Sequence, residues 1–140
     1  MNSQLFADSV EEELRLAWKG RGLREKAAEE EIQRAIENLL HALGLEEYKE
    51  RHPMSLSGGQ KQRLALATCL LQDASFFYFD EPTSGMDRKN MLRIAALLKQ
   101  QQREDRILFV VSHDTAFLQE VATEYLDLEL FRKRTGEARN

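Results

Sequence analysis

The chain has 140 residues, of which 42% are hydrophobic and 31% charged, a composition typical of one globular domain of moderate size. Its net charge of −4 argues against a general attraction to nucleic acid or to an anionic membrane surface. The sequence has no apolar run near the ~18 residues that a membrane-spanning helix needs, no signal-peptide pattern, and one cysteine, Cys69. We therefore expect a soluble protein of a reducing compartment, or one that reaches a membrane only through partners.

The first third of the chain predicts helices. Ser9 and Glu12 form a capping-box pattern that opens one helix, and the glycines within 19–22 end it. Apolar residues then repeat at spacings of three and four over 24–43, which predicts the clearest helix of the chain, with Gly44 at its C-terminal cap.

The centre of the chain predicts an anion-binding turn at the start of a helix. Ser57 is a good N-cap, and the backbone N–H groups of residues 58–60 can approach a ligand closely because the first two are glycines. Free amides and the positive end of the helix dipole favour a phosphate, and Lys61 and Arg63 are expected to add basic charge nearby. Cys69, further along this apolar helix, is expected to be a buried thiol.

A short aromatic run, 76–79, follows this helix and ends in two carboxylates, Asp80 and Glu81. Such a run is typical of a strand covered on both faces, as in a parallel sheet. Pro82 lacks the N–H that a sheet ladder requires, so we expect the strand to end there. In open α/β sheets ligands bind beyond the carboxyl ends of the strands, where these two carboxylates are predicted to emerge.

The rest of the chain predicts a second strand and three further elements. A helix over 87–102 precedes an apolar run at 107–111, which gives a βαβ unit expected to cross over right-handed. A helix over 115–122 follows. Leucines at 126, 128 and 130 alternate with acidic residues, which predicts a strand with one wet face.

Four segments, in this order, resemble the motifs of ATP-binding-cassette (ABC) ATPases. Residues 56–60 (Leu-Ser-Gly-Gly-Gln) look like the signature motif, and 76–81 look like the Walker B strand with its carboxylates. Residues 84–87 are similar to the D-loop, and 112–114 to the switch histidine. One motif alone is a weak signal, but four in the family's order at plausible spacing are a strong one.

The resemblance covers nearly the whole chain except its last ten residues. It implies an α/β fold that is part of the ABC-type P-loop NTPase fold, with a helical subdomain at 1–54, the second half of the catalytic core at 55–131 and a flexible tail at 132–140. The segments 4–14 and 51–55 look most like the ATPase subunits of energy-coupling-factor importers for vitamins and metal ions.

The same resemblance implies roles for individual residues in ATP hydrolysis. Asp80 would help to hold Mg²⁺, Glu81 would act as general base for the attacking water, and His113 would contact the γ-phosphate. Family ATPases work as head-to-tail dimers, in which the signature of one subunit closes on ATP held by the other. The residues expected to serve a partner's nucleotide in this way are Ser57, Gly58, Gly59, Gln60 and Asp87.

One part of the family pattern is not found in these residues. No Gly-x4-Gly-Lys-Ser/Thr sequence precedes the helical portion, and the family's magnesium-binding glutamine is also missing. We therefore expect the chain alone to bind ATP poorly, and to be a fragment or to need an associated half. Without that half, apolar faces of 76–79 and 107–111 are expected to lack cover.

The leading hypothesis is an ATP-binding and ATP-hydrolysing component of an ABC transporter that energises solute import. A transmembrane partner would dock on the helical portion at the cytoplasmic face of the cell membrane. The alternative is a truncated, non-hydrolysing fragment that supplies the signature in trans or regulates a partner ATPase. A DNA-repair or chromosome-associated ABC ATPase is disfavoured, because the helix over 24–43 is too short for a long coiled coil, and we expect no nucleic-acid partner.

Overall fold

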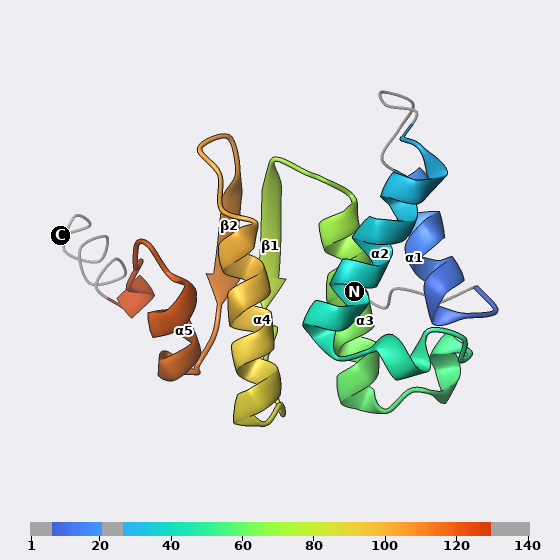
Figure 1. Cartoon of the computed structure of the whole chain (residues 1–140). Coiled ribbons are helices and arrows are strands. Elements are labelled where there is room, and N and C mark those ends of the chain that lie inside the picture. The colour runs from blue at the N-terminus through green and yellow to red at the C-terminus, as the bar shows by residue number, and fades with distance from the viewer. Residues whose placement is uncertain (1–6, 21–26, 130–140) are drawn as a thin grey trace, which may run out of the picture.

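A layer of helices lies beside a small parallel sheet (Figure 1). The computed structural model describes residues 7–20 and 27–129. In chain order the elements are α1 (Val10–Lys19), α2 (Glu29–Leu43), the 3₁₀ turns η1 (Glu46–Tyr48) and η2 (Pro53–Ser55), α3 (Gly58–Leu71), β1 (Phe76–Asp80), α4 (Arg88–Gln100), β2 (Ile107–Val111) and α5 (Thr115–Val121). Helices α1, α2 and α3 pack together, and α4 joins this layer to the sheet and to α5. The architecture is therefore α/β, as predicted.

The predicted helix caps are formed, with two differences in detail. The Ser9 hydroxyl accepts a hydrogen bond from the Glu12 N–H, but the Glu12 carboxylate accepts from the Asp8 N–H and does not complete the capping box. Gly44 ends α2 in the left-handed conformation, at φ 64°. The predicted start of this helix at residue 24 is wrong for the described part, because residues 27–28 are not helical and α2 begins at Glu29.

The sheet consists of two parallel strands within the described residues. Its register runs from Phe76 opposite Ile107 to Asp80 opposite Val111, and α4 connects the two strands in sequence. Because the strands are parallel, both carboxyl ends lie at the same edge. Figure 1 shows that the first turns of α3 and α4 lie at this edge too. The predicted βαβ unit is confirmed.

The core occupies one face of the sheet and the inside of the helical layer. Phe77 and Phe79 are 3% and 7% exposed, whereas Phe76 and Tyr78, which alternate with them, are 55% and 54% exposed. The prediction of a strand covered on both faces is therefore wrong for these residues, because the described helices pack on one face only. The expectation that an apolar face would lack cover is confirmed. Exposed Ile107 and Phe109 of β2 belong to the same uncovered face, on which the rings of Tyr78 and Phe109 stack 5.9 Å apart.

The predicted strand at 126–130 is wrong over its described residues. Residues 126–127 form no regular structure and 128–129 are helical, while residue 130 and the predicted tail lie outside the described part of the chain. Leu126 and Leu128 are both exposed. An alternating pattern produces a strand only where a neighbouring strand supplies the hydrogen bonds, and no such neighbour lies beside these described residues.

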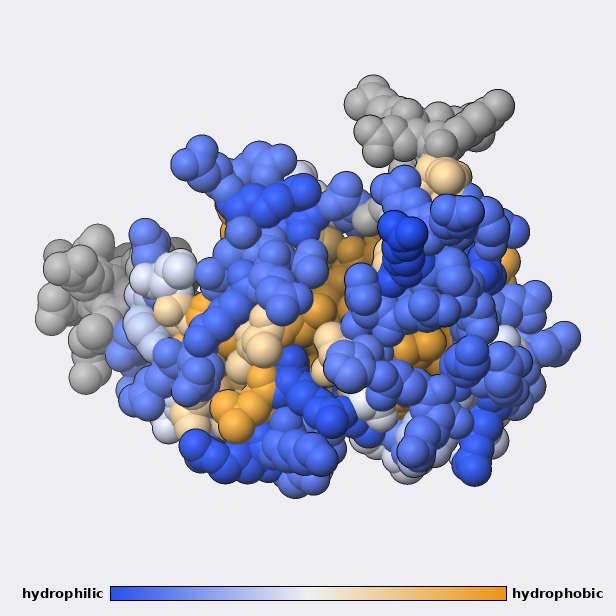
Figure 2. All heavy atoms as spheres, in the orientation of Figure 1, coloured by the Kyte–Doolittle hydropathy of each residue, from blue (hydrophilic) through white to orange (hydrophobic). Residues whose placement is uncertain are grey.

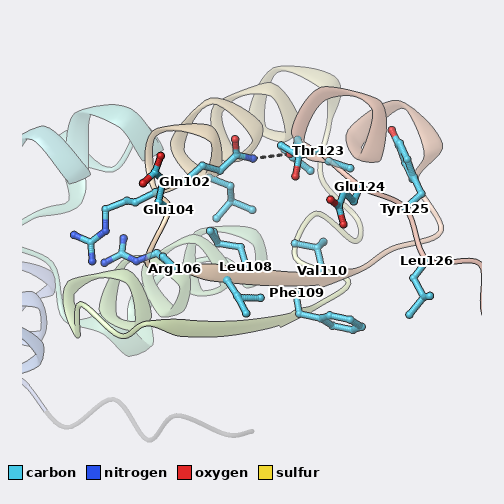
Figure 3. A pocket seen from close by; sticks show the side chains of 15 residues that line it. Gln102, Glu104, Arg106, Leu108, Phe109, Val110, Thr123, Glu124, Tyr125 and Leu126 are labelled. Atoms are coloured by element: carbon cyan, nitrogen blue, oxygen red, sulfur yellow. Dashed lines mark hydrogen bonds between the residues drawn. The ribbon is translucent and has the colours of Figure 1, made fainter.

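A hollow of about 870 Å³ lies along β2, beside the end of α4 and residues 121–126 (Figure 3). Leu108 and Val110 point towards the helices there, whereas Phe109 points to the opposite side of the strand. Gln102 and Val121 line the hollow, and the Gln102 amide donates to the Val121 carbonyl at 2.7 Å. This hollow follows the side of β2 away from β1, where the described sheet has no further strand.

Most of the face shown in Figure 2 is hydrophilic, and apolar atoms are visible in the seam between α2 and α4. Within residues 7–20 and 27–129, no helix combines the length and the apolar character required to cross a bilayer.

Candidate functional site

The candidate site is built where the two parallel strands end. Asp80 is the last residue of β1 and Glu81 follows it, while Ser112 and His113 follow β2. The backbone continues the ladder one step further, because the Glu81 N–H donates to the Val111 carbonyl at 2.8 Å. The chain thus places two acidic residues of one strand end beside a hydroxyl and an imidazole of the next.

The Glu81 carboxylate is held against the segment that leaves β2. Its Oε1 accepts a hydrogen bond from the His113 backbone N–H at 2.9 Å, and its Oε2 lies 3.5 Å from the Ser112 hydroxyl. The His113 Nε2 lies 3.5 Å from the same Oε1. The structure therefore brings together two residues that were predicted for the same site, Glu81 and His113, although 32 positions separate them in sequence.

Glu81 adopts an uncommon backbone conformation, with φ 50°. A non-glycine residue in the left-handed region costs roughly 1–3 kcal/mol, and such strain persists only where surrounding contacts hold it. Here the contacts are the bonds of its N–H to Val111 and of its carboxylate to residues 112–113. The turn re-aims the side chain from the strand towards the neighbouring strand end.

The two side chains of the pair differ in their exposure to solvent. The Glu81 side chain is 30% exposed, and the His113 side chain is 98% exposed. A carboxylate anchored on one side and accessible on the other can accept a proton from a bound water. An imidazole that is nearly free of protein contacts can reach a ligand that approaches the same edge.

Asp80 is exposed at the end of β1. Among the described residues, no group of three or more His, Cys, Asp or Glu side chains could hold a metal ion. A single carboxylate still fits Mg²⁺, because this ion is commonly bound through one or two carboxylates together with substrate phosphates and waters. Asp80 thus has the donor type and the position to bind an ion together with substrate phosphates and waters. It does not form a metal site made of protein ligands alone.

The signature segment forms a complete capping box at the start of α3. The Ser57 hydroxyl accepts from the Gln60 N–H at 3.3 Å, and the Gln60 side chain accepts from the Ser57 N–H at 2.9 Å. The Gln60 N–H is therefore engaged within the cap. The amides of Gly58 and Gly59 are in the first turn of α3, where no intrahelical acceptor exists for them.

Packing inside the chain does not explain the two glycines. A Cβ added to Gly58 or to Gly59 would meet no atom within 4 Å. Both residues are exposed, so a ligand can approach the first turn of α3. The start of a 14-residue helix favours an anion.

Arg63 does not add charge to this opening, which corrects the prediction. Its guanidinium is buried, and its Nη1 donates to the Leu43 carbonyl at 2.9 Å and to Asn90 Oδ1 at 2.6 Å. Desolvation by burial, followed by the charge of Arg93, lowers the Arg63 pKa from its ordinary value. The side chain points into the protein because α3 is packed on several sides, so a basic residue on it can be interior.

Asp87 caps α4 and closes the loop that follows β1. Its Oδ1 accepts from the Asn90 N–H at 2.8 Å. Two internal hydrogen bonds shape the loop, from the Ser84 N–H to the Glu81 carbonyl and from the Met86 N–H to the Thr83 carbonyl. Asp87 is exposed, and its role towards a partner's nucleotide stays a prediction.

Sequence reasoning missed Gln62. Its Nε2 donates to the carbonyls of Glu81 and Pro82, at 3.3 and 3.1 Å, and so ties α3 to the residues after β1. Periodicity gives no signal for this contact, because the partners lie 19 and 20 positions away. Within the described chain, no direct hydrogen bond joins residues 57–60 to Asp80, Glu81 or His113. The predicted residues thus form two groups.

Comparisons with known proteins agree with the predicted family. The sequence profile of the family described as ABC transporter matches residues 2–84. A Treponema denticola protein whose name describes an ABC transporter ATP-binding protein is 38% identical over 140 residues, covering 98% of this chain and 27% of the relative. The energy-coupling factor transporter ATP-binding protein EcfA1 of Thermotoga maritima is 32% identical, covering 86% of this chain and 45% of the relative.

A solved structure gives the same answer for the fold. The dimeric ATP-binding cassette MJ0796, in a post-hydrolysis state bound to ADP and Pi, matches with a TM-score of 0.67 and 25% identity. The match covers 84% of this chain and 54% of that one, so the chain spans about half the length, or less, of the proteins compared. Because the family profile matches more than half of its residues, the chain belongs to the ABC transporter family.

Proposed function

We propose that the chain is part of an ATP-binding and ATP-hydrolysing component of an ABC transporter, and that it energises solute import. The observation that carries the proposal is the pairing of Glu81 with His113 at the common carboxyl edge of two parallel strands. In phosphoryl transfer, the protein contributes mainly positioning and charge stabilisation, and this pair has the chemistry for both.

The residues would divide the work at the chain's own nucleotide. Bound Mg²⁺ would neutralise charge on the phosphates, and Asp80 would hold it at the strand end. Glu81, anchored by residues 112–113, would orient and deprotonate the attacking water. His113 is exposed enough for its imidazole to contact the terminal phosphate.

Residues 57–60 and Asp87, the signature group, would serve a different nucleotide. A second ATPase subunit in a head-to-tail dimer would hold that nucleotide. No hydrogen bond in the described chain links residues 57–60 directly to Asp80, Glu81 or His113, which supports this division. The amides of Gly58 and Gly59, in the exposed first turn of α3, would receive the partner's terminal phosphate. MJ0796, a cassette of the same family, is dimeric in its ADP- and Pi-bound state.

The uncovered face of the sheet supports a second proposal, that the chain works together with the remaining half of an ATP-binding cassette. These 140 residues contain no Gly-x4-Gly-Lys-Ser/Thr pattern, and an apolar face with Phe76, Tyr78, Ile107 and Phe109 is exposed. Parallel sheets are normally covered on both faces. We propose that a P-loop-bearing segment, from the same longer protein or from another, covers this face, and that the chain without it binds ATP poorly.

Import and membrane attachment follow from the relatives by analogy. The likeness to EcfA1 supports an energy-coupling-factor type of importer. Transmembrane subunits would dock on the layer of α1, α2 and α3, at the cytoplasmic face of the membrane. The chain would then be attached to the membrane through these partners.

A second candidate is a non-hydrolysing fragment that lends its signature to a partner ATPase. The separation of the signature group from Glu81 and His113 favours this alternative, because such a fragment needs only residues 57–60 and the adjoining loop.

ATP hydrolysis measured in two mixtures tests both candidates. In the first mixture, the chain is combined with a polypeptide that carries the missing P-loop half. Hydrolysis should appear only in the mixture, and Glu81→Gln should reduce it by on the order of 10²–10⁴-fold, the usual contribution of a positioned base. An exposed glutamine on α5 provides the matched control, Gln119→Glu, which should leave the rate unchanged.

In the second mixture, the chain is combined with an intact family ATPase whose own signature serine has been replaced. Restored hydrolysis that is lost with Ser57→Arg but kept with Glu81→Gln would select the signature-lending alternative. Hydrolysis in the first mixture that is unaffected by Glu81→Gln would overturn the proposed catalytic role.

A further inference from the structure

We propose that two adjacent side chains of α3, Gln62 and Arg63, form a clamp on both ends of the loop 82–87, so that the signature helix and this loop move as one unit. The clamp itself is a structural statement about the chain. Its consequence for hydrolysis rests on the proposed function, because the loop matters there as part of a nucleotide site.

Gln62 holds the first end of the loop. Its Nε2 donates to two consecutive carbonyls, those of Glu81 at 3.3 Å and Pro82 at 3.1 Å. Pro82 and Thr83 are buried behind this contact. One amide group therefore fixes the backbone at the point where the chain turns away from Glu81.

Arg63 holds the other end through Asn90. Its Nη1 donates to Asn90 Oδ1 at 2.6 Å, and the Asn90 N–H donates to Asp87 Oδ1 at 2.8 Å. The same Nη1 donates to the Leu43 carbonyl at 2.9 Å, at the end of α2. Because Arg63 is only 8% exposed and Leu43 is fully buried, loss of these bonds would leave the Leu43 carbonyl without this donor in the protein interior.

Between its two held ends, the loop has an exposed tip and two local hydrogen bonds, from the Ser84 N–H to the Glu81 carbonyl and from the Met86 N–H to the Thr83 carbonyl. Ser84 and Gly85 are exposed, Gly85 has φ 72°, and a Cβ at that glycine would meet no atom within 4 Å. A segment with exposed residues and few packing contacts opens at low free energy unless its ends are restrained. The two side chains of α3 supply that restraint.

The clamp makes Gln62 and Arg63 positioning residues. They follow Ser57–Gln60 on the same helix, so any displacement of the signature is passed to the loop at both ends. Through Leu43 it is also passed to the helical layer, on which the proposed transmembrane partner docks. Neither side chain needs to touch a nucleotide for this role.

Hydrogen exchange of the full chain, followed by mass spectrometry, tests the clamp without any ligand. The reporters are the N–H groups of Ser84, Met86 and Asn90, each of which donates a hydrogen bond in or beside the loop. In Gln62→Glu the side chain keeps its size but loses both donor hydrogens. We expect exchange over 82–90 to quicken roughly three- to tenfold, since one hydrogen bond contributes about 0.5–1.5 kcal/mol.

Arg63→Met should have the same local effect at the other end of the loop, and Arg63→Lys should restore part of the protection because it returns a donor. Matched controls are Gln119→Glu on α5 and Arg34→Met on α2, both at exposed positions. If Arg63→Met does not fold, Gln62→Glu decides the matter, since that side chain is half-buried. Unchanged exchange over 82–90, or an equal rise in α1, would overturn the clamp.

A kinetic readout connects the clamp to function and keeps the two proposals distinguishable. In the hydrolysing mixture, Gln62→Glu should lower kcat several-fold with KM for ATP unchanged, as expected for lost positioning without lost binding. Because loss of folded protein alone also lowers the apparent kcat with KM unchanged, kcat is calculated per folded molecule from circular dichroism, and a value unchanged on that basis would indicate a structural role only. If the unmodified chain supports no hydrolysis in any mixture, the proposed function fails, while the exchange experiment still decides on the clamp.

Discussion

The helical layer and the parallel sheet bury their apolar residues to different extents. In the layer, residues such as Leu14, Ile36 and Leu40 are fully or almost fully buried by neighbouring helices. In the sheet, one face is buried and the other exposes aromatic rings. The reason is the range of the contacts: helices close in sequence can cover one another, whereas a parallel strand depends on segments that are distant in sequence. The helical layer therefore encloses its apolar residues, whereas the sheet buries apolar residues on one face only.

The largest effect is expected from a cavity in the helical layer. Leu40 is 2% exposed in the common core, so Leu40→Ala should lower the free energy of unfolding by about 2–5 kcal/mol. Denaturant unfolding followed by circular dichroism measures this loss. Leu16→Ala, at an exposed position of α1, is the matched control and should change the free energy little. Equal losses for the two variants would contradict the description of the layer as a closed core.

A smaller effect is expected where the layer meets the candidate site. Ser57→Ala removes the acceptor for the Gln60 N–H and should cost about 1 kcal/mol, the usual value of a helix N-cap. Ser57→Asp keeps an acceptor at the cap and should retain most of the stability. It also places a negative charge where a phosphate is proposed to bind, so it should abolish signature function. A variant that loses both together would indicate that the cap and the proposed binding role cannot be separated.

The contrast between layer and sheet also explains what could be predicted from the sequence. Caps and helices depend on residues a few positions apart, so Ser9, Ser57 and Gly44 were predicted correctly. The pairing of Glu81 with His113 was predictable despite its long range, because parallel strand ends meet at one edge and the motif order fixed which strands these were. Apolar strand residues, by contrast, indicate that other segments must cover both faces of the sheet. They do not indicate whether this chain contains those segments.

The interior role of Arg63 could not be predicted in the same way. Its acceptors lie 20 and 27 positions away, and its sequence neighbours Gln60 and Lys61 suggested a polar surface. Only the packing of α3 against other elements turns this side chain inward. The strand predicted at 126–130 failed for a related reason, since alternation gives no information about the neighbour that a strand requires.

Replacement of Cys69 on α3 tests whether the thiol at this position is shielded from water. The residue is half-buried, not fully buried as predicted, and this partial burial raises the pKa of its thiol, so the folded chain holds the thiol proton to higher pH than the unfolded chain does. This contribution to stability is complete below the ordinary thiol pKa and is lost as pH rises through the raised value. Cys69→Ser, which does not titrate in this range, should show a shallower fall in denaturation midpoint at alkaline pH. Identical slopes for both proteins would indicate that the thiol is open to solvent.

The smallest effect on stability is expected on the uncovered face of the sheet, and it distinguishes the two regions most directly. Ile107→Thr and Phe76→Thr keep strand propensity and remove apolar surface that the described chain leaves exposed. The free energy of unfolding should change by no more than about 0.5 kcal/mol, as for other exposed positions. Self-association in sedimentation experiments should decrease, because large exposed apolar patches promote it.

Phe77→Thr, on the covered face of the same strand, should instead destabilise the chain by several kcal/mol. If the two faces respond alike, the sheet is already covered in solution by a second molecule. In that event, adding the P-loop half should displace this molecule and restore the asymmetry between Phe76 and Phe77.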